Sequence, residues 1–410
     1  MNKKNESKNL NQFLTRYDDK KHNEALVKEK YPTGWQPHAE YDPKTNKGTL
    51  VSRGTKEQEP EFATLLSEWG FDPKEYEIVG NLQVRTWDMN MGDGNVQQAW
   101  YYKADIRKKV PDFDTDFAKL LKEIKTYKIK SQPVKKGNTA FMYYVADYQL
   151  GKRDGKGSEE IVSKVLDSLD SANARLKELK KAGHTIDEIY VIGLGDIVEN
   201  CDISGWYSSQ IWNVDLHLRD QITVARRLLW KIVKNFADQN YKVVLSGVTS
   251  NHGQNRSGKQ SLATEELDNL DLQILEQVGD LVYESKYKNI KVIVPESPHL
   301  LLDVKGYLMG FTHGHLTAGG GTPAKKIENW WKGQMFGLNE AGDNPVGLAK
   351  MIVHGHYHHF TAVTQGGRTI MGVPAMSPST DFQTRTGYST STGVVTMTVT
   401  KDGWDNFKIL

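Results

Sequence analysis

Hydrophobic and polar residues follow a different pattern in each of three stretches of this chain. Residues 1–30 are dominated by Lys, Asn, Asp and Glu, which offer little apolar surface to bury, so we expect a flexible polar tail there. Residues 31–110 contain one helical pattern followed by two strand-like runs. From 138 to 410, short apolar runs alternate with amphipathic segments, which indicates stacked βαβ units. Residues 111–137 read as a helix followed by a basic linker that contains Pro and Gly.

The first folded part is predicted to be a small α+β domain. The segment Glu59–Trp69 has the helical spacing of apolar residues, and Gly70 follows it in the position of a C-terminal cap. Two strand-like runs, Tyr76–Met89 and Val96–Ile106, flank Met91–Asn95, whose glycines favour a hairpin turn. One helix and one β-hairpin are therefore expected in this part.

The second folded part is predicted to contain two sheets. Apolar runs of the buried type predict strands at 141–145, 189–193, 243–245, 292–294, 307–311, 351–353 and 369–371. Amphipathic spacing predicts helices at 158–182, 213–238 and 322–335. Helices separate the first strands, whereas strands dominate after residue 290. This order favours an α/β fold, a layered α/β/β/α sandwich that follows the small α+β domain.

Composition is typical of a soluble globular protein. The 410 residues include 38% hydrophobic and 25% charged residues, and the formal charge of +2 creates no strong overall field that would attract nucleic acid. Cys201 is the single cysteine, which excludes a disulfide framework and a cysteine-rich zinc site and fits a reducing compartment. No apolar run approaches the roughly 20 residues that span a bilayer, and the basic N-terminus lacks the apolar stretch of a signal peptide. We expect a cytoplasmic protein that does not bind membranes.

Histidines gather in the sequence VHGHYHH at residues 353–359, which holds four of the twelve histidines. A metal site usually takes ligands from several segments, and the strands of the second part end in polar residues. These residues are Asp147, Gln149, Asp196, Asn251, His252, His313, His356 and His358. Because ligand sites of α/β folds collect at the carboxyl ends of strands, these side chains are expected to converge. An isolated Asp after a strand usually forms a turn, but carboxylates, amides and imidazoles on five strand ends favour a divalent metal site.

The order of these motifs resembles that of the calcineurin-like metallophosphoesterase superfamily. The corresponding stretches are Asp147–Gln149, Gly195–Asp196, Asn251–His252, His313 and Gly355–His358, within a match that covers about residues 138–380. The resemblance implies a metallophosphoesterase sandwich over 138–410 and a metal-dependent hydrolase that acts on ester bonds. It also implies two divalent metal ions that share one carboxylate, an arrangement that promotes in-line displacement at phosphorus.

The resemblance assigns ligands to each metal ion residue by residue. The first metal ion would be bound by Asp147, Asp196 and His358, with Gln149 at the remaining corner. The second metal ion would be bound by Asp196, Asn251, His313 and His356, so that Asp196 bridges the pair. His252 would bind no metal. It would lie over the scissile phosphate and stabilise its charge or protonate the leaving oxygen, a task suited to an imidazole near neutral pH.

Three positions depart from the pattern of the superfamily. Gln149 stands where a histidine is usual, so the first metal ion gains a neutral amide oxygen or no ligand there, and we expect weaker binding that favours harder ions such as Mn or Mg. Ser250 replaces a glycine. Gly253 replaces the acidic residue that usually follows the histidine, so His252 needs another partner to orient it, and Glu199 is a candidate.

Further residues near these motifs are candidates for substrate contacts. Arg256 and Lys259 follow His252 closely and could bind phosphate groups, although a solvated loop explains them equally well. His315 could contact the substrate or support a ligand. The donor set as a whole suits two divalent ions, with Mn expected and Mg, Fe, Zn or Ni as alternatives.

The predicted hairpin favours nucleic acid as the substrate. It combines aromatic and basic residues, namely Trp87, Trp100, Tyr101, Tyr102, Arg85, Lys103, Arg107, Lys108 and Lys109, which suit contacts to bases and phosphates. The alternative is a half-buried hairpin with one solvated face. We expect a two-metal phosphodiesterase that cleaves DNA or RNA, similar to DNA-repair exonucleases such as the nuclease subunit of double-strand-break processing complexes.

Two other functions remain open from the sequence. The chain could be a phosphatase or a small-nucleotide phosphodiesterase whose N-terminal domain serves as a lid. It could instead be a degenerate, non-catalytic scaffold that recruits partners, as Gln149 and Gly253 hint. The retention of His252 disfavours the scaffold, because a scaffold needs no acid for a leaving group. The oligomeric state is left open.

Overall fold

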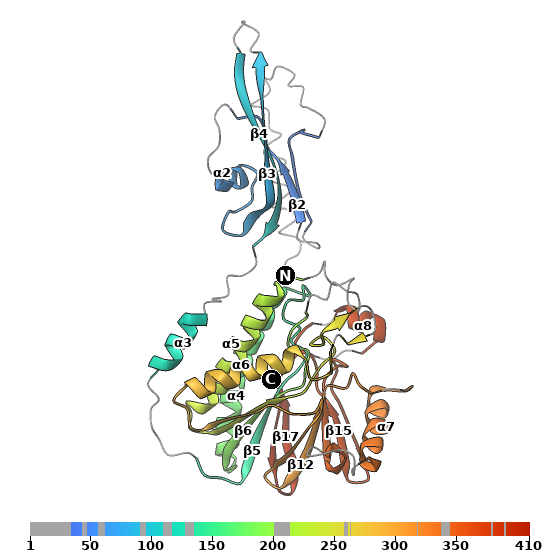
Figure 1. Ribbon diagram of the computed structural model, residues 1–410. Helices are drawn as coiled ribbons and strands as arrows, with labels where there is room; N and C mark the ends of the chain where they lie inside the picture. Colours follow the sequence, from blue (N-terminus) through green and yellow to red (C-terminus); the bar gives the residue numbers. More distant parts are fainter. Residues whose placement is uncertain are drawn as a thin grey trace. The chain divides into compact units, whose positions relative to one another are not determined.

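The computed structural model describes most of the chain as two compact units, residues 1–111 and 112–410, each of which is considered by itself (Figure 1). The described residues are 34–42, 47–55, 62–90, 96–109, 117–127, 135–200, 214–257, 261–262, 264–317, 319–337, 345–378, 380–388 and 391–410. The expected tail over 1–30, the hairpin turn at 91–95 and most of the basic linker lie outside them. No helix in these ranges is long and apolar enough to cross a membrane.

The first unit contains a four-stranded antiparallel sheet and one helix. Its elements are β1 (His38–Asp42), β2 (Lys47–Val51), α2 (Phe62–Glu68), β3 (Tyr76–Asn90) and β4 (Val96–Lys108), with the sheet order β1-β2-β4-β3. The hairpin of β3 and β4 and the helix match the sequence expectation. Gly70 adopts a φ of 80° after α2, as expected of a C-terminal cap. The sequence pattern did not predict β1 and β2, which are short and partly polar.

Aromatic residues of the hairpin form part of the core of the first unit. Tyr101 and Tyr102 are 1% and 2% exposed. The ring of Trp87 stacks on Tyr101 with 3.5 Å between the ring centroids. The half-buried hairpin, which the sequence left as an alternative, therefore describes these aromatic residues better than a surface that stacks bases. Arg107 forms an ion pair with Glu77 at 2.7 Å.

The second unit contains two larger sheets. The six-stranded sheet has the order β10-β7-β6-β5-β16-β17, with β5 (Thr139–Val145), β6 (Ile186–Gly193), β7 (Lys242–Gly247), β10 (Ile290–Ile293), β16 (Val395–Thr400) and β17 (Gly403–Ile409). The five-stranded sheet has the order β11-β12-β13-β15-β14, with β11 (Leu300–Val304), β12 (Tyr307–Thr312), β13 (Met351–His354), β14 (Thr361–Gln365) and β15 (Arg368–Gly372). Two short strands, β8 (Arg256–Ser257) and β9 (Ser261–Leu262), pair with each other.

Helices cover the outer face of each sheet. On the six-stranded sheet lie α4 (Ser158–Lys181), α5 (Leu218–Ala237) and α6 (Leu270–Glu284), and α3 (Phe117–Thr126) packs on α6. On the five-stranded sheet lie α7 (Pro323–Phe336) and the 3-10 helix η3 (Val346–Leu348), while α8 (Thr380–Thr386) follows β15 in the chain. The layers therefore run α/β/β/α, which confirms the predicted fold class (Figure 1).

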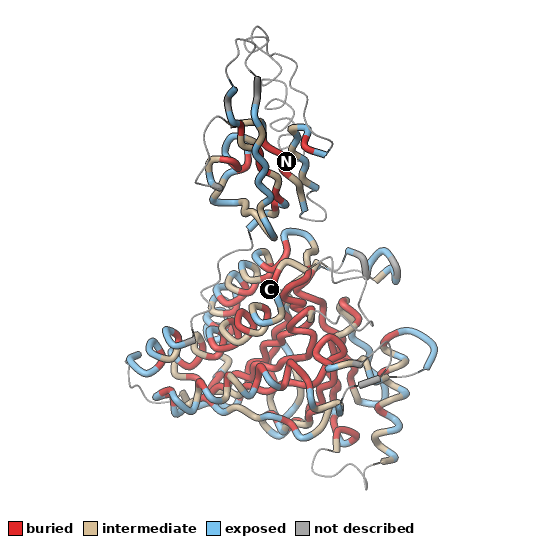
Figure 2. The backbone as a smooth tube through the Cα atoms, turned by 45° about the horizontal axis from the view of Figure 1, so that its top comes forward, coloured by how far each residue is buried: buried red, intermediate tan, exposed pale blue. Residues whose placement is uncertain are grey.

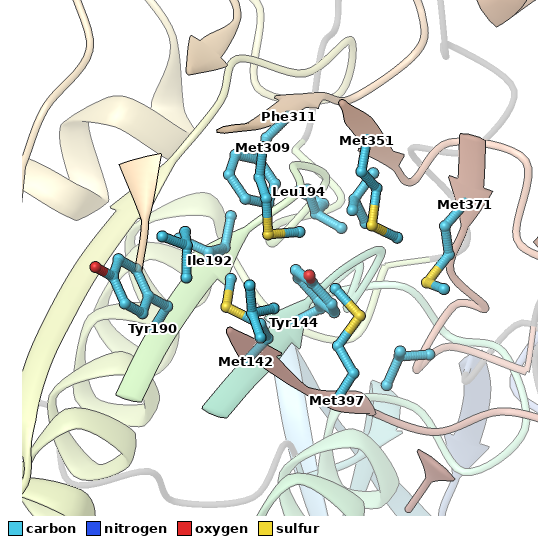
Figure 3. Packing of buried hydrophobic residues seen from close by; sticks show 14 of the residues in the cluster. Met142, Tyr144, Tyr190, Ile192, Leu194, Met309, Phe311, Met351, Met371 and Met397 are labelled. Carbon is cyan, nitrogen blue, oxygen red and sulfur yellow. The ribbon is translucent and has the colours of Figure 1, made fainter. Parts of the chain in front are cut away.

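The main core of the second unit lies between the two sheets. Figure 2 shows buried residues running through the strands of this unit. The residues that face each other in Figure 3 are Met142, Tyr144 and Met397 on the six-stranded sheet and Met309, Met351 and Met371 on the five-stranded sheet. Each of them is at most 1% exposed, so the core holds the two sheets in a fixed position relative to each other. This rigid frame carries the loops that follow the strands.

Candidate metal centre

The ends of parallel strands bring the sequence-predicted ligands together. In the six-stranded sheet, Val145 is paired with Gly193 and Gly193 with Gly247, so the chain leaves β5, β6 and β7 at the same edge. The loops that begin there carry Asp147, Asp196 and Asn251. In the five-stranded sheet, Thr312 is paired with His354, so His313 and the loop 355–358 leave β12 and β13 together. Ligands from both sheets meet between these two edges.

Backbone conformation is unusual at five of these positions. Asp147, Gln149, Asp196, His356 and His358 have φ values of 51°, 45°, 52°, 68° and 57°. Residues other than glycine rarely adopt positive φ, because the β-carbon then crowds the backbone. Such strain persists only where surrounding contacts impose it, and it gathers at functional sites. The loops are therefore held in shapes that the sequence alone would not favour.

Two groups of side chains in this region could each hold a metal ion. The first group is Asp147, Asp196 and His358, and the second is Asp196, His313 and His356; within each group the ligand atoms lie within 4.8 Å of one another. Asp196 belongs to both groups. The resemblance implied this division of the histidines, because it gave His358 to the first metal ion and His356 to the second.

Spacing between ligand atoms fits a coordination shell. His313 Nε2 lies 3.1 Å from Asp196 Oδ2 and 2.8 Å from Asn251 Oδ1, and His358 Nε2 lies 3.2 Å from Asp147 Oδ1. Ligands at roughly 2.1 Å from a metal ion are separated by about 3.0 Å in an octahedron and about 3.4 Å in a tetrahedron. The residues present therefore fit a divalent ion.

Several contacts hold the ligands in place before any ion binds. The Nδ1 atom of His313 donates a hydrogen bond to the carbonyl oxygen of Leu194 at 2.7 Å, which leaves Nε2 free to bind metal. The backbone N–H of His356 donates to the Asp147 carboxylate at 3.1 Å. Gly355 has no room for a side chain, since a β-carbon there would lie 2.7 Å from Asp147 Oδ2. The glycine therefore permits the close approach of two ligand loops.

Charges in the centre perturb the ionisation of its members. Burial alone would raise the pKa of Asp196, but the neighbouring imidazoles of His313 and His252 hold that pKa well below its usual value. Burial lowers the pKa of His313, yet the Asp196 carboxylate outweighs it and raises this pKa to about 9. Burial lowers the pKa of His356 well below its usual value. A divalent ion bound at Asp196 would displace the proton of His313, as is usual when metal binding is coupled to protonation.

His252 lies beside the two groups and is oriented by Glu199. Its Nδ1 atom is 3.0 Å from the carbonyl oxygen of Glu199 and 3.4 Å from that residue's Oε2. Its Nε2 atom is 3.8 Å from Asp196 Oδ2 and 3.4 Å from the amide nitrogen of Gln149. Because Nδ1 can donate to the Glu199 carbonyl, Nε2 is the ring atom turned toward the metal ligands. The backbone carbonyl of Glu199 therefore orients the ring, with the carboxylate of the same residue close by.

Two residues at the start of α6 hold the loops that carry Asp196 and Ser250. The carboxylate of Asp271 accepts hydrogen bonds from the backbone N–H groups of Asp196 and Ile197, both at 3.1 Å, and from the hydroxyl of Ser250. Asn269, the N-cap of α6, donates to the carbonyl oxygen of Ser250 at 2.8 Å. Asn269 and Asp271 therefore connect two ligand loops, and Ser250 provides the hydroxyl that one of these bonds requires.

Sequence reasoning missed these two residues. The sequence does carry a signal for α6, since Asn269 stands in the N-cap position before apolar residues at helical spacing. It carries no signal for the contact of Asp271 with a loop 75 residues earlier in the chain. That contact depends on the packing of α6 against the sheet.

Replacing Gly253 with alanine is expected to destabilise the protein by about 1–3 kcal/mol. A β-carbon at this position would lie 2.2 Å from Asn269 Oδ1 and 3.1 Å from Asp271 Oδ2, and both side chains are buried and hydrogen-bonded. Urea unfolding of the variant measures the loss. Gly333→Ala is the control, because its β-carbon would meet nothing within 4 Å. An equal effect of the two changes would contradict the close packing described here.

The structure gives different surroundings to the other residues predicted to contact substrate or metal, which are Arg256, Lys259, His315 and Gln149. Arg256 donates to the amide oxygen of Gln254, whose amide nitrogen in turn donates to Glu266 at 2.8 Å. His315 Nε2 is 2.9 Å from Glu266 Oε1, so His315 belongs to this neighbouring network. Lys259 lies outside the described residues. The amide oxygen of Gln149 accepts a hydrogen bond from Lys152 at 3.1 Å.

Comparison with known proteins gives only distant likenesses. No family model and no curated protein matches the chain. Among solved structures, the chain is similar to an archaeal phosphodiesterase, with 10% identity, a TM-score of 0.31, and coverage of 66% of this chain and 99% of the other. It is also similar to vacuolar protein sorting 29 from Cryptosporidium parvum, with 12% identity, a TM-score of 0.28, and coverage of 64% of this chain and 86% of the other. A predicted phosphoesterase from Streptococcus pneumoniae is similar with 11% identity, a TM-score of 0.24, and coverage of 65% of this chain and 91% of the other. Likenesses of this size do not by themselves assign a function.

Proposed function

We propose that this chain is a two-metal phosphoesterase of the calcineurin-like type that hydrolyses phosphodiester bonds in DNA or RNA. The observation that carries the proposal is the position of Asp196. Its carboxylate belongs to two buried ligand groups, one completed by His358 and the other by His313 and His356. A carboxylate shared by two such groups is the arrangement that places two cations side by side.

The ligand groups suggest which ions bind and what they contribute. Asp147, Asp196 and His358 would hold the first ion, and Asp196, Asn251, His313 and His356 would hold the second. Mixed oxygen and nitrogen donors suit Mn²⁺, and the same donors also accept Mg²⁺, Fe²⁺, Zn²⁺ or Ni²⁺. When bound, the two ions would neutralise phosphoryl oxygens and lower the pKa of the attacking water.

The proposed task of His252 is to protonate the leaving oxygen. Its Nδ1–H is directed to the Glu199 carbonyl oxygen, so the proton that it transfers must be carried on Nε2. That atom lies 3.8 Å from the shared carboxylate of Asp196, so a phosphate bound to the two ions would lie within its reach. The ring is 6% exposed, which keeps bulk water from competing for the proton.

Support for a nucleic-acid substrate comes from the first unit. Arg85, Lys108 and Lys109 are exposed on or next to β3 and β4, where they can contact a phosphate backbone. A small phosphoester is the second candidate, because the centre itself is enclosed: Asn251 and His358 are each 8% exposed. A buried centre admits a small ester more readily than a duplex.

A substrate panel distinguishes the candidates. The full chain with Mn²⁺ is incubated with a linear DNA, an RNA and an aryl phosphodiester, alongside the His252→Ala variant. We expect cleavage of nucleic acid that falls by about 10²- to 10⁴-fold in the variant, the usual contribution of a general acid, while bound Mn²⁺ is unchanged. Cleavage of the aryl ester alone would support the small-ester candidate. The panel is repeated with Mg²⁺, Fe²⁺, Zn²⁺ and Ni²⁺ in place of Mn²⁺. If no substrate is cleaved with any of these five ions, a non-catalytic scaffold is favoured.

A further inference from the structure

Lys152 is a buried cation that the proposed mechanism does not use. The side chain is 7% exposed and lies in the loop after β5, three residues beyond Gln149. Its ammonium donates to the amide oxygen of Gln149 at 3.1 Å, and among the residues that the structure describes this is its one hydrogen bond. An ammonium has three N–H groups, and a buried charge is unfavourable unless it is paired. Lys152 therefore has donors to offer to a further acceptor.

The surroundings of Lys152 indicate where that acceptor binds. The amide nitrogen of Gln149 is 3.4 Å from His252 Nε2, so one amide group lies between the ammonium and the ring. This amide can donate to Nε2 once that atom has given up its proton, and so positions the ring in its neutral form. The nearby Glu199 carboxylate is buried and attracts the Lys152 ammonium electrostatically, but in the described part of the chain its two oxygens accept no hydrogen bond, so the ammonium N–H groups are not used there. The Lys152 ammonium is therefore linked through the Gln149 amide to His252, whose Nε2 lies 3.8 Å from Asp196 Oδ2.

Gln149 itself is poorly placed to bind a metal ion. Its oxygen, the only atom of the amide that can be a ligand, already accepts from Lys152, and an ammonium at this distance repels a cation. Among the acidic residues and histidines that the structure describes, the first ligand group then consists of Asp147, Asp196 and His358.

We propose that Lys152 binds a non-bridging oxygen of the substrate phosphate next to the first metal ion, and that Gln149 positions Lys152 and His252 instead of binding metal. This inference rests on the proposed phosphoesterase function and deepens it. The ligand class is a phosphate group, either of a phosphoester or as free orthophosphate. An ammonium is a point charge that attracts a phosphoryl oxygen without demanding a particular geometry, which suits a substrate that changes shape during hydrolysis.

Binding of inorganic phosphate tests the role of Lys152. Calorimetric titration of the Mn²⁺-loaded full chain is compared with Lys152→Met and with Lys156→Met, which removes an exposed lysine four residues away. We expect phosphate to bind roughly 10- to 100-fold more weakly to Lys152→Met, as is typical when a charged hydrogen bond is lost, and normally to the control. Unchanged affinity in Lys152→Met would overturn the proposal. Free phosphate and a non-cleaved phosphodiester analogue, titrated separately, distinguish the two sources of the phosphate group.

Stability separates a binding role from a structural one. Methionine fills the volume of the lysine without a buried charge, so the unfolding temperature of metal-free Lys152→Met is expected to equal or exceed that of the wild type. A marked loss of stability would assign Lys152 to the framework and contradict the proposal. Lys152→Arg keeps the charge, and we expect it to retain part of the phosphate affinity even if the methionine variant folds poorly.

Gln149→Ala tests the second half of the proposal. Equilibrium dialysis with Mn²⁺ is expected to give the same two affinities as the wild type, whereas kcat falls and phosphate binds more weakly. Weaker Mn²⁺ binding would show that Gln149 is a ligand and would overturn this part. Binding of phosphate and of Mn²⁺ can be measured without catalytic turnover. A protein that binds phosphate through Lys152 but hydrolyses no phosphoester would refute the phosphoesterase function and leave the phosphate site supported.

Discussion

Replacing Asp196 with asparagine is expected to abolish hydrolysis and to weaken the binding of both metal ions. The carboxylate is 1% exposed and belongs to both ligand groups, and its Oδ1 also accepts the backbone N–H of His252 at 3.0 Å. Asparagine keeps the shape and one acceptor but removes the negative charge. Changes to partners of metal ligands already lower metal affinity by about 10- to 100-fold, so the loss of a shared ligand is expected to exceed about a hundredfold for each ion.

Thermal unfolding in the presence of Mn²⁺ measures this effect. An ion at a hundred times its Kd stabilises the folded state by about 2.7 kcal/mol, so the wild type should unfold at a higher temperature with Mn²⁺. Asp196→Asn should show little or no such increase. Asp187→Asn is the control, because Asp187 is also a buried carboxylate of β6 but forms an ion pair with Lys305 at 2.7 Å. A normal Mn²⁺ response in Asp196→Asn would rule out the shared-ligand role.

Replacing Asp271 with alanine is expected to lower the free energy of unfolding by about 3–5 kcal/mol. Three donors would lose their acceptor inside the protein, namely the N–H groups of Asp196 and Ile197 and the hydroxyl of Ser250. Each unsatisfied buried donor costs about 1–3 kcal/mol. Removing the charge offsets part of this loss, because burial raises the pKa of Asp271 to about 6 and so makes its ionised form unfavourable. Mn²⁺ affinity should fall as well, since the loop that carries Asp196 loses its support.

Two further variants show whether the loss of stability comes from the hydrogen bonds that Asp271 accepts. Asp271→Asn keeps an acceptor for the backbone N–H groups, so its loss of stability should be smaller than that of alanine. Asp280→Ala changes an exposed residue of the same helix and should stay within about 0.5 kcal/mol of the wild type. Urea unfolding and Mn²⁺ titration of the three variants provide the comparison. If Asp271→Ala resembled Asp280→Ala in both measurements, α6 would not support the ligand loops.

The sequence was sufficient to find the candidate ligands because their signal is local. Each ligand follows a strand that is recognisable from its apolar residues, and the carboxyl ends of parallel strands share an edge. Asp147 after β5 and His313 after β12 illustrate this rule. The layered fold could be predicted for the same reason, since helices separate the parallel strands of the first sheet.

Residues that act through distant contacts could not be predicted. Asp271 and Lys152 each stand in a sequence context that suits an ordinary surface residue. Their roles depend on burial and on partners that only the folded chain supplies. A single sequence does not contain that information in any short pattern.

For two tyrosines in the hairpin of the first unit, the local pattern suggested a surface role that their burial does not support. Aromatic and basic residues on β3 and β4 resembled a surface that stacks bases. Tyr101 and Tyr102 are adjacent, yet both are buried, because helix α2 and the strands β1 and β2 belong to the same small core. Neither strand could be recognised from alternation alone, since β1 and β2 have five residues each.

The division of the ligands between two sheets bears on how the protein matures. Each ligand group combines residues from the six-stranded and the five-stranded sheet, and β16, close to the end of the chain, pairs with β5 inside the first of these sheets. A ribosome releases Asp147 more than 200 residues before His358 and β16. The two proposed ion sites can therefore form only after the segment that carries His356 and His358 has been synthesised. Metal would then bind where two folded sheets meet, and not to the first sheet alone.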